Sequence, residues 1–363
     1  MHNGTGKISP KSINFIDLFC GIGGFRLAID GIAHETNLTA RCVLSSDIDS
    51  ECQKAYEGNF GDRPIGDIKK VDADTIPDHD LLLGGFPCQA FSIIGQMRGF
   101  ADIRGTLFFD IARILKAKKP SAFILENVKL LTGHNQGKTL KRILETLRGL
   151  GYHTDYRVLN ALKFGLPQKR ERVFIVGFKA ADAFSKFEWP EGGFPMTSLK
   201  EILEKHVPRK HYASERIRLR RFSKLQPTAE PTIWHENKAG HVSAYPFSCA
   251  LRAGASYNYL LVNGERRLTP REMLRLQGFP ESFKIVCNDS QMRKQAGNSV
   301  PVNLVRAVAE KVFEAQGWIP RHQNKQTTYS LSTPEQMRLL EQKSPYGRTT
   351  AANCRKARAP ISA

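Results

Sequence analysis

Several features that would place a protein in a membrane or outside the cell are missing from this 363-residue sequence. No apolar run approaches the ~18 residues that a membrane-spanning helix needs. Residues 1–11 are polar and lack the apolar core of a secretory signal. The 7 cysteines are odd in number and no two are spaced as C-x-x-C, which disfavours a disulfide framework or a zinc site. We therefore expect a cytoplasmic protein with no membrane association and no metal.

Acidic residues are also scarce relative to basic ones. The sequence has 35 Asp and Glu against 54 Lys and Arg, a net charge of +19. So basic a composition favours a polyanionic partner. The alternative, that scattered basic side chains only keep the protein soluble, stays open at this point.

Strand-like and helix-like runs alternate through the first 178 residues. Short apolar runs rich in β-forming residues predict strands at residues 13–19, 41–45, 80–83, 122–125 and 172–177. Helical spacing of apolar residues predicts helices at residues 106–118 and 138–147, and another from Ser50 to about residue 59, with Ser50 as its cap. This rhythm indicates an α/β fold with a Rossmann-like, doubly wound, mostly parallel sheet.

The rhythm fades between residues 179 and 266, which predicts a smaller separate domain or a long insertion. A basic cluster within it comprises Arg216, Arg218, Arg220, Arg221 and Lys224. A phosphate-binding patch is favoured there over a solvated helix face. Regular structure resumes at Thr269, where a capping box with proline at the first helical position predicts a helix. A last helix is expected at residues 302–315, followed by a basic, disordered tail at 319–363.

A glycine-rich segment, DLFCGIGGF, follows the first predicted strand at residues 17–25. It is not the G-x-G-x-x-G of dinucleotide sites, so a nucleoside without a phosphate tail suits it better. Asp47 follows the second strand, where a carboxylate can accept hydrogen bonds from ribose hydroxyls, and the alternative for this Asp47–Asp49 segment is a helix N-cap at Asp49. Asp67 and Ile68 follow a third loop and would meet an adenine. Together these loops predict an adenosine pocket at the carboxyl edge of the sheet.

Two further loops at the same edge carry reactive side chains. Cys88 lies in GFPCQAFS, directly after a strand, and its flanks are unlike those of a buried structural cysteine, so we expect a nucleophile. Glu126 follows the strand at 122–125 and can pair with a base, with a helix cap as the alternative. Arg170 and Arg172 in QKRER alternate onto one strand face, where an edge-strand ladder of ion pairs is the alternative.

In this order the motifs resemble the DNA (cytosine-5) methyltransferase family of bacterial restriction–modification systems. The series is DLFCGIGGF, DID, GDI, GFPCQAFS, GTLFFDIARIL, ENV, QKRER, RLTPREMLRLQGFP and QAGNSVP. It spans residues 13–316. The resemblance implies methyl transfer from S-adenosylmethionine to C5 of a flipped cytosine in a specific double-stranded DNA sequence. It also implies a bacterial protein with a catalytic domain at 1–178, a target-recognition domain and hinge at 179–297, and a returning helix at 298–318.

The resemblance assigns roles by position. Cofactor contacts are implied for Phe19, Gly21, Gly23, Gly24, Asp47, Ile48, Asp67, Ile68, Pro87, Leu107, Asn298 and Ser299. Catalytic roles are implied for Cys88 as nucleophile, Glu126 on the target base, and Arg170 and Arg172 orienting the base. DNA contacts are expected at Gln89, Ser92, Arg216, Arg218, Arg252, Gly254 and Arg271. The sequence departs from the commonest pattern at Asp47, where glutamate is usual, at Ile48, where an aromatic side chain often stacks, and at Lys169, where many members have arginine.

Other functions compete with this interpretation. An RNA (tRNA) cytosine-5 methyltransferase of the same fold would lack a substantial sequence-reading insertion, and the stretch at residues 179–266, between QKRER and RLTPRE, is 88 residues long here. A non-catalytic DNA-binding relative would lack Cys88 or Glu126. A nicotinamide oxidoreductase would need a pyrophosphate-binding glycine turn. We expect a monomer, and a cognate restriction endonuclease acting on the same DNA site.

Overall fold

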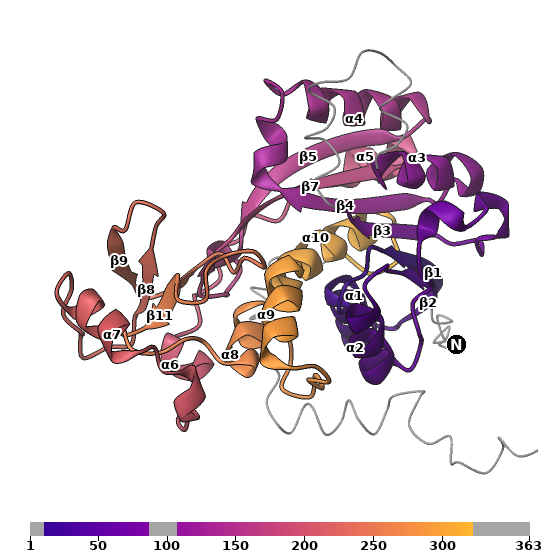
Figure 1. Cartoon of the computed structure of the whole chain (residues 1–363). Helices are drawn as coiled ribbons and strands as arrows, with labels where there is room; N and C mark the ends of the chain where they lie inside the picture. Colours follow the sequence, from indigo (N-terminus) through magenta and orange to yellow (C-terminus); the bar gives the residue numbers. More distant parts are fainter. Residues whose placement is uncertain (1–10, 87–106, 322–363) are drawn as a thin grey trace, which may run out of the picture. The chain divides into compact units, whose positions relative to one another are not determined.

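A six-stranded sheet organises the first half of the chain (Figure 1). The computed structural model describes residues 11–86 and 107–321, which belong to one compact unit. The strand order is β2-β1-β3-β4-β7-β5. The strands are β1 (Lys11–Leu18), β2 (Leu38–Ser46), β3 (Leu81–Gly85), β4 (Ala122–Val128), β5 (His153–Asn160) and β7 (Glu171–Phe178). Neighbours from β2 to β4 run parallel, and β7 is antiparallel to both β4 and β5. This confirms the predicted mostly parallel sheet.

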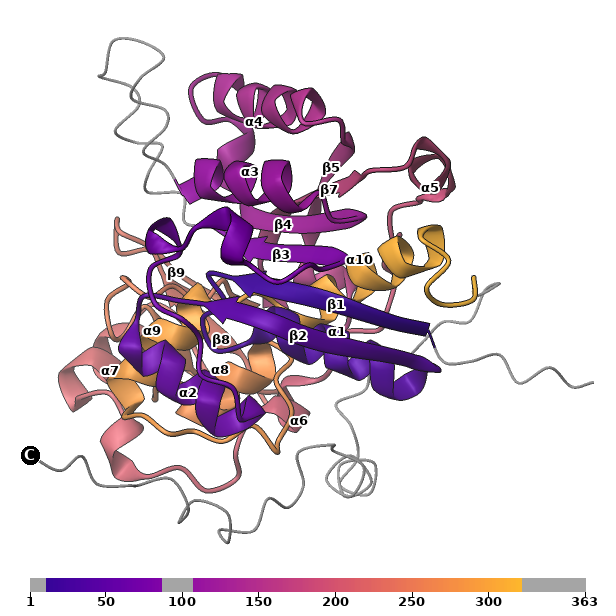
Figure 2. The same ribbon diagram turned by 90° about the vertical axis from the view of Figure 1, so that its right-hand side faces the viewer.

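Helices cover both faces of this sheet (Figure 2). On one face α3 (Leu107–Lys118) and α4 (Lys138–Gly149) share a buried cluster with Ile16 and Leu18 of β1. The opposite face carries α1 (Gly24–Glu35), which packs against α10 (Val302–Ala315). Arg26 of α1 lies over the ring of Phe15, the strand neighbour of Ile16. Since successive strand residues point to opposite faces, β1 contributes to both cores.

The observed elements depart from the sequence prediction at α2 (Ser50–Phe60) and at β5, and agree with it at α10. The helix α2 is capped by Asp49, whose Oδ1 accepts a hydrogen bond from Glu51 N at 3.0 Å. Ser50 is the first helical residue, so its predicted capping role is wrong. The strand β5 was not predicted at all. In contrast, α10 begins and ends where the apolar periodicity placed it.

A smaller region between β7 and α8 holds a three-stranded antiparallel sheet of order β11-β8-β9. Its elements are α6 (Leu199–Ile202), α7 (Glu215–Phe222), β8 (Ile233–Glu236), β9 (Val242–Tyr245), β10 (Ser248–Cys249) and β11 (Leu260–Val262). Trp234 of β8 is fully buried at its centre, with Gly264 packed on the indole. The short β10 pairs with β6 (Gln168–Lys169), which directly precedes β7.

The chain enters and leaves this smaller region close to the large sheet. The helix α5 (Ala181–Lys186) follows β7 and packs back on it, with the Phe184 ring stacked on His153 of β5. The boundary expected at residue 178 stays a prediction. On the return path, α8 (Pro270–Leu276) starts with the predicted capping box, in which Glu272 N donates to the Thr269 hydroxyl. α9 (Asp289–Asn298) then leads into α10. No helix in the described ranges is long and apolar enough to cross a membrane.

Candidate active site

Glu126 and Arg172 form a buried ion pair at the end of β4. Antiparallel register sets Val128 opposite Arg172 and Glu126 opposite Phe174, so the period of two places Glu126 and Arg172 on one face. Arg172 Nε lies 2.8 Å from Glu126 Oε1, and the two side chains are 12% and 10% exposed. Burial raises the pKa of the Glu126 carboxyl, and the positive charges of Arg172 and Arg170 oppose the rise. The pair therefore presents a carboxyl that retains its proton to higher pH than a free glutamate.

The end of β3 lies directly beside this pair. Gly85 is the register partner of Glu126, and a Cβ at Gly85 would lie 3.8 Å from Glu126 Oε2. Asn127 Nδ2 donates to the Phe86 carbonyl at 2.8 Å, which fastens the chain two positions before Cys88. Sequence reasoning missed this role, although Asn127 is the middle residue of the ENV motif. Four predicted site residues, Pro87, Cys88, Gln89 and Ser92, lie outside the described residues.

Arg170 occupies a different environment from Arg172. It lies between β6 and β7, is fully buried, and donates to three backbone carbonyls. Its Nη1 lies 2.7 Å from Leu251 O, and its Nη2 lies 3.0 Å from Gly297 O and 2.6 Å from Ser299 O. Arg170 therefore precedes the strand that carries Arg172, and backbone carbonyls occupy its guanidinium. Its guanidinium joins the segment before β11 to the end of α9.

Gly297 shows how closely these two segments approach. A Cβ at position 297 would lie 2.4 Å from Ala253 N, closer than real side chains come. Only glycine lets α9 pack against the backbone of residues 252–253. Because α9 ends at Asn298, this contact links the segment expected to approach DNA with two residues expected to bind the cofactor, Asn298 and Ser299.

The glycine-rich loop after β1 turns sharply toward α1. Phe19, Gly21 and Gly23 have positive φ values of 56°, 54° and 88°. A Cβ at Gly23 would lie 2.2 Å from the Phe60 ring, so this position requires glycine for space as well as for its backbone conformation. The Asp47 carboxylate accepts hydrogen bonds from Gly21 N and Asp49 N, both at 2.8 Å. Asp47 thus joins the loop after β1 to the end of β2.

The surroundings of this loop fit an adenosine-containing cofactor. A Cβ at Gly21 would meet nothing within 4 Å, so its backbone is open to a ligand. Ile48 is 76% exposed, which leaves an apolar surface beside Asp47. On the other side of the loop, Gly24 abuts Ser299, because a Cβ at Gly24 would lie 3.2 Å from Ser299 Oγ. Carboxylate, apolar surface and exposed backbone therefore gather at the carboxyl ends of β1 and β2.

The other residues expected to bind the cofactor differ in their exposure and in their structural roles. Asp67 caps the short helix η1 (Ile68–Lys70) by accepting from Lys69 N at 3.1 Å. The Ile68 side chain is buried in the core with α3, so only its backbone is available to an adenine. Leu107 is the first residue of α3 and is half-buried, and Asn298 is exposed. Among residues 11–86 and 107–321, no three His, Cys, Asp or Glu side chains gather as metal ligands would.

The basic cluster on α7 is less available to DNA than its composition indicates. Arg221 is fully buried and bonds to Asn258 O at 2.7 Å and to Glu236, which Arg220 also contacts. Lys224 donates to Gly240 O at 2.6 Å. Treating all five basic residues as one exposed patch is therefore wrong.

Arg216 is exposed on α7, whereas Arg218 is half-buried. Arg252 and Gly254 are exposed in the segment before β11, consistent with a loop that approaches a ligand. Arg271 differs, because its Nη2 donates to Phe283 O at 2.8 Å and its Nη1 to Pro280 O at 3.2 Å. Its guanidinium is thus engaged in holding the loop after α8.

Comparison with known proteins identifies the family. The model of the C-5 cytosine-specific DNA methylase family matches residues 13–314. The Type II methyltransferase M.HaeII of Haemophilus aegyptius is 53% identical over 308 residues, covering 84% of this chain and 94% of that protein. M.NgoBI of Neisseria gonorrhoeae is 54% identical over 297 residues, covering 80% and 90%. The Entamoeba histolytica methyltransferase EhMeth shares the fold, with a TM-score of 0.64 at 18% identity, covering 84% and 99% of the two chains. The chain belongs to the C-5 cytosine-specific DNA methylase family.

Proposed function

We propose that this DNA (cytosine-5) methyltransferase acts on a cytosine flipped out of duplex DNA, with Cys88 as nucleophile and Glu126 as the group that binds the base. The observation that carries this proposal is the buried pair of Glu126 and Arg172 beside the end of β3. Asn127 fixes Phe86, two positions before Cys88, to the same strand end. The chain that leads to the thiol therefore starts next to the carboxyl.

The chemistry follows from the weak nucleophilicity of C5 in an aromatic ring. Addition of the Cys88 thiolate forms a bond to C6 and moves electron density to C5. Charge on the ring is limited if N3 receives a proton or a strong hydrogen bond, which a protonated Glu126 supplies. The raised pKa of Glu126 supports this role. Once C5 has taken up a methyl group, a base removes the C5 proton, the C6–S bond breaks, and the thiolate is regenerated.

The loops after β1 and β2 are proposed to hold the methyl donor. When bound, S-adenosylmethionine supplies the electrophilic methyl group that C5 takes up. Asp47 would accept hydrogen bonds from the ribose, and Ile48 would cover the adenine. The backbone at Phe19 and Gly21 would contact the remainder of the nucleoside, and Ser299 would close the pocket from α9. The carboxyl ends of β1 to β4 would thus hold donor and acceptor side by side.

Base flipping requires favourable contacts to offset unstacking and unpairing, which cost a few kcal/mol. Contacts from basic side chains to DNA phosphates supply such energy. Exposed Arg216 and Arg252 are the residues we propose for this from the original set. Arg172 would hold the Glu126 carboxyl in place against the base, and Arg170 would act only through the backbone that it binds.

The biological role is proposed from the relatives. M.HaeII and M.NgoBI are named Type II methyltransferases. We infer that this chain methylates a specific sequence and protects it from a cognate restriction endonuclease. A monomer is proposed because one base is flipped at a time. The family description names DNA, so the RNA substrate is not favoured, and family membership sets aside the nicotinamide oxidoreductase.

Bisulfite sequencing of a plasmid from cells that express the gene tests activity and specificity together. We expect one cytosine in one short sequence to be protected from conversion. The Cys88→Ala variant should bind the same duplex yet transfer no methyl group, which also separates an enzyme from a purely DNA-binding protein. Methyl transfer by that variant would contradict the mechanism, and methylation of tRNA in place of duplex DNA would revive the RNA alternative.

A further inference from the structure

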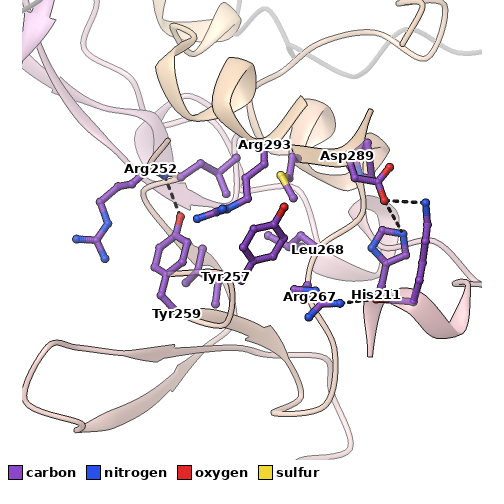
Figure 3. Close-up of a pocket in the computed structure, with 13 residues that line it drawn as sticks. His211, Arg252, Tyr257, Tyr259, Arg267, Leu268, Asp289 and Arg293 are labelled. Carbon is purple, nitrogen blue, oxygen red and sulfur yellow. Dashed lines mark hydrogen bonds and ion pairs between the residues drawn. The ribbon is translucent and has the colours of Figure 1, made fainter. Parts of the chain in front are cut away.

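A cavity of about 200 Å³ lies between the segment that leads into β11 and the helices α8 and α9 (Figure 3). Its charged lining comes from η8 (Arg209–His211), the segment before β11, the segment before α8, and α9. The charged and aromatic residues that the argument uses are Lys210, Arg252, Tyr257, Arg267, Asp289 and Arg293. Only Arg252 among them was predicted to bind DNA.

Positive charge exceeds negative charge in this cavity. Asp289 is the acidic residue of the lining, and Lys210 Nζ lies 2.7 Å from its Oδ2. His211 Nε2 lies 3.7 Å from the same oxygen. In the part of the chain that the structure describes, Arg252, Arg267 and Arg293 form no ion pair with a carboxylate. Three guanidinium charges therefore remain uncompensated around one space, which favours an anionic occupant.

The guanidinium groups are held in place by aromatic rings. Tyr257 lies between two of them, with Arg293 at 4.4 Å and Arg267 at 5.8 Å from its ring centroid (Figure 3). Arg252 lies 4.9 Å over Tyr259, whose hydroxyl accepts from Arg252 N at 2.9 Å. Cation–π contacts restrain the cations without neutralising them. The arrangement is therefore preorganised for an anion.

The guanidinium groups of Arg293 and Arg267 keep N–H donors that a ligand can use. Arg293 uses Nη2 on the Ala255 carbonyl, and Arg267 uses Nη2 on the Lys210 carbonyl and Nη1 on Asn258 Oδ1 at 3.4 Å. An arginine has five N–H donors, so each retains donors for a ligand. Tyr257 is 50% exposed and presents an apolar ring edge beside them. Cationic donors next to a half-exposed aromatic ring match a phosphodiester and its attached sugar.

The cavity shares a wall with the candidate active site. Leu251 and Arg252 line the cavity. The Leu251 carbonyl also accepts from Arg170 Nη1, and the backbone of residues 252–253 packs against Gly297. Arg172, two residues after Arg170 in the chain, lies in β7 and pairs with Glu126. A duplex with its base at Glu126 would therefore carry its backbone past this wall.

We propose that this cavity binds one backbone phosphate of the DNA substrate, with Arg293 and Arg267 as the principal donors and Tyr257 against the sugar. The proposal rests on the proposed function, and it assigns phosphate binding to residues outside the α7 cluster. Such a contact positions the duplex and adds no base readout of its own. The occupant is a phosphodiester of the substrate, as distinct from free inorganic phosphate.

The test compares Arg293→Gln, Arg293→Lys and Arg267→Gln with Arg41→Gln, which removes an exposed arginine from the middle of β2. DNA affinity is measured against salt concentration with the duplex that bisulfite sequencing identifies. Each neutralised phosphate contact contributes ~0.9 to the slope of log K against log salt. We expect the slope to fall by about one in Arg293→Gln and in Arg267→Gln, and to stay near wild type in Arg293→Lys and Arg41→Gln. Equal slopes in Arg293→Gln and Arg41→Gln, with both proteins folded by circular dichroism, would overturn the proposal.

Two further experiments distinguish a phosphate of the DNA backbone from free inorganic phosphate. Duplexes with a single neutral methylphosphonate are scanned along both strands. One position should weaken wild-type binding yet leave Arg293→Gln binding unchanged, and the absence of such a position would overturn the proposal. Inorganic phosphate is tested as a stabiliser of the DNA-free protein. Specific stabilisation of wild type by it, with unchanged DNA salt slopes in the variants, would assign the cavity to a free anion. Wild-type methylation of the same duplex is measured first, so failure of the proposed function is seen separately.

Discussion

Replacing Glu126 by glutamine perturbs the site with little change of shape. The glutamine amide can still accept a hydrogen bond from Arg172 Nε, but it carries no charge and cannot donate a carboxyl proton to N3. Arg172, at 12% exposed, then keeps a buried charge without its carboxylate. Removing one partner of a buried pair costs about 3–5 kcal/mol of stability, and the retained hydrogen bond places our expectation at about 3 kcal/mol.

The expected increase in activation free energy for methyl transfer is of similar size to the loss of stability, so the two must be measured separately. Proton donation by a positioned side chain contributes about 10²–10⁴-fold to a rate, or ~3–5 kcal/mol of activation free energy. Single-turnover methyl transfer with excess enzyme measures the chemical step, and urea unfolding followed by circular dichroism measures stability. Glu171→Gln is the matched control, because Glu171 is more exposed and pairs with Lys129 at 3.0 Å. That change should leave both quantities near wild type.

The pH dependence supplies a second signature of Glu126. Burial raises its pKa, so the protonated, donating form is lost as pH rises through that value. The wild-type single-turnover rate should therefore have a descending limb at high pH that the glutamine variant lacks. A folded Glu126→Gln protein that methylates within twofold of wild type would refute the assignment of Glu126 as the proton donor.

Three further perturbations follow from the described geometry. Burial raises the pKa of Asp17 to about 8 from an ordinary value of 3.8, so folding favours its protonated form. As pH rises from 4 to 8, the free energy of unfolding of wild type should fall relative to that of Asp17→Asn, by up to about 1.4 kcal/mol per pH unit. A difference in urea midpoint between the two proteins that stays constant across that window would contradict this. Gly23→Ala should lose about 2–4 kcal/mol because of its positive φ and the Phe60 contact, whereas an alanine at the open Gly149 should not. Arg170→Lys should cost about 3 kcal/mol and raise KM for DNA more than it lowers the single-turnover rate. A rate loss as large as that of Glu126→Gln would instead place Arg170 on the reacting groups.

Much of the sheet was predictable because its central strands are buried on both faces. β3 and β4 consist largely of apolar residues, and β1 has four apolar residues between Ile13 and Leu18, which single these strands out in the sequence. β5 escaped prediction because it lies at the edge of the sheet, its sequence HTDYRVLN is mostly polar, and half of its residues are exposed. A polar edge strand lacks the apolar run that marks a buried one.

The sequence predicted which residues belong to the candidate site better than it predicted which partners they contact. Glu126 and Arg172 could be named from motifs, but their pairing depends on β7 running antiparallel to β4, which a βαβ rhythm does not indicate. Arg170 donates to backbone carbonyls. Because every residue has a backbone carbonyl, the sequence cannot indicate which residues are its partners. Likewise Arg216 and Arg221 look alike in the sequence, although only Arg221 lies on the buried face of α7.

Covalent trapping with 5-fluorocytosine tests the central claim most directly. Fluorine at C5 cannot leave as a proton does, so a thiolate added at C6 stays attached once the methyl group has been transferred. A target duplex with this base should give a denaturation-resistant protein–DNA adduct, linked through Cys88 by mass spectrometry and absent from Cys88→Ala. Normal turnover on cytosine with no adduct on 5-fluorocytosine, or an adduct formed by Cys88→Ala, would contradict the account.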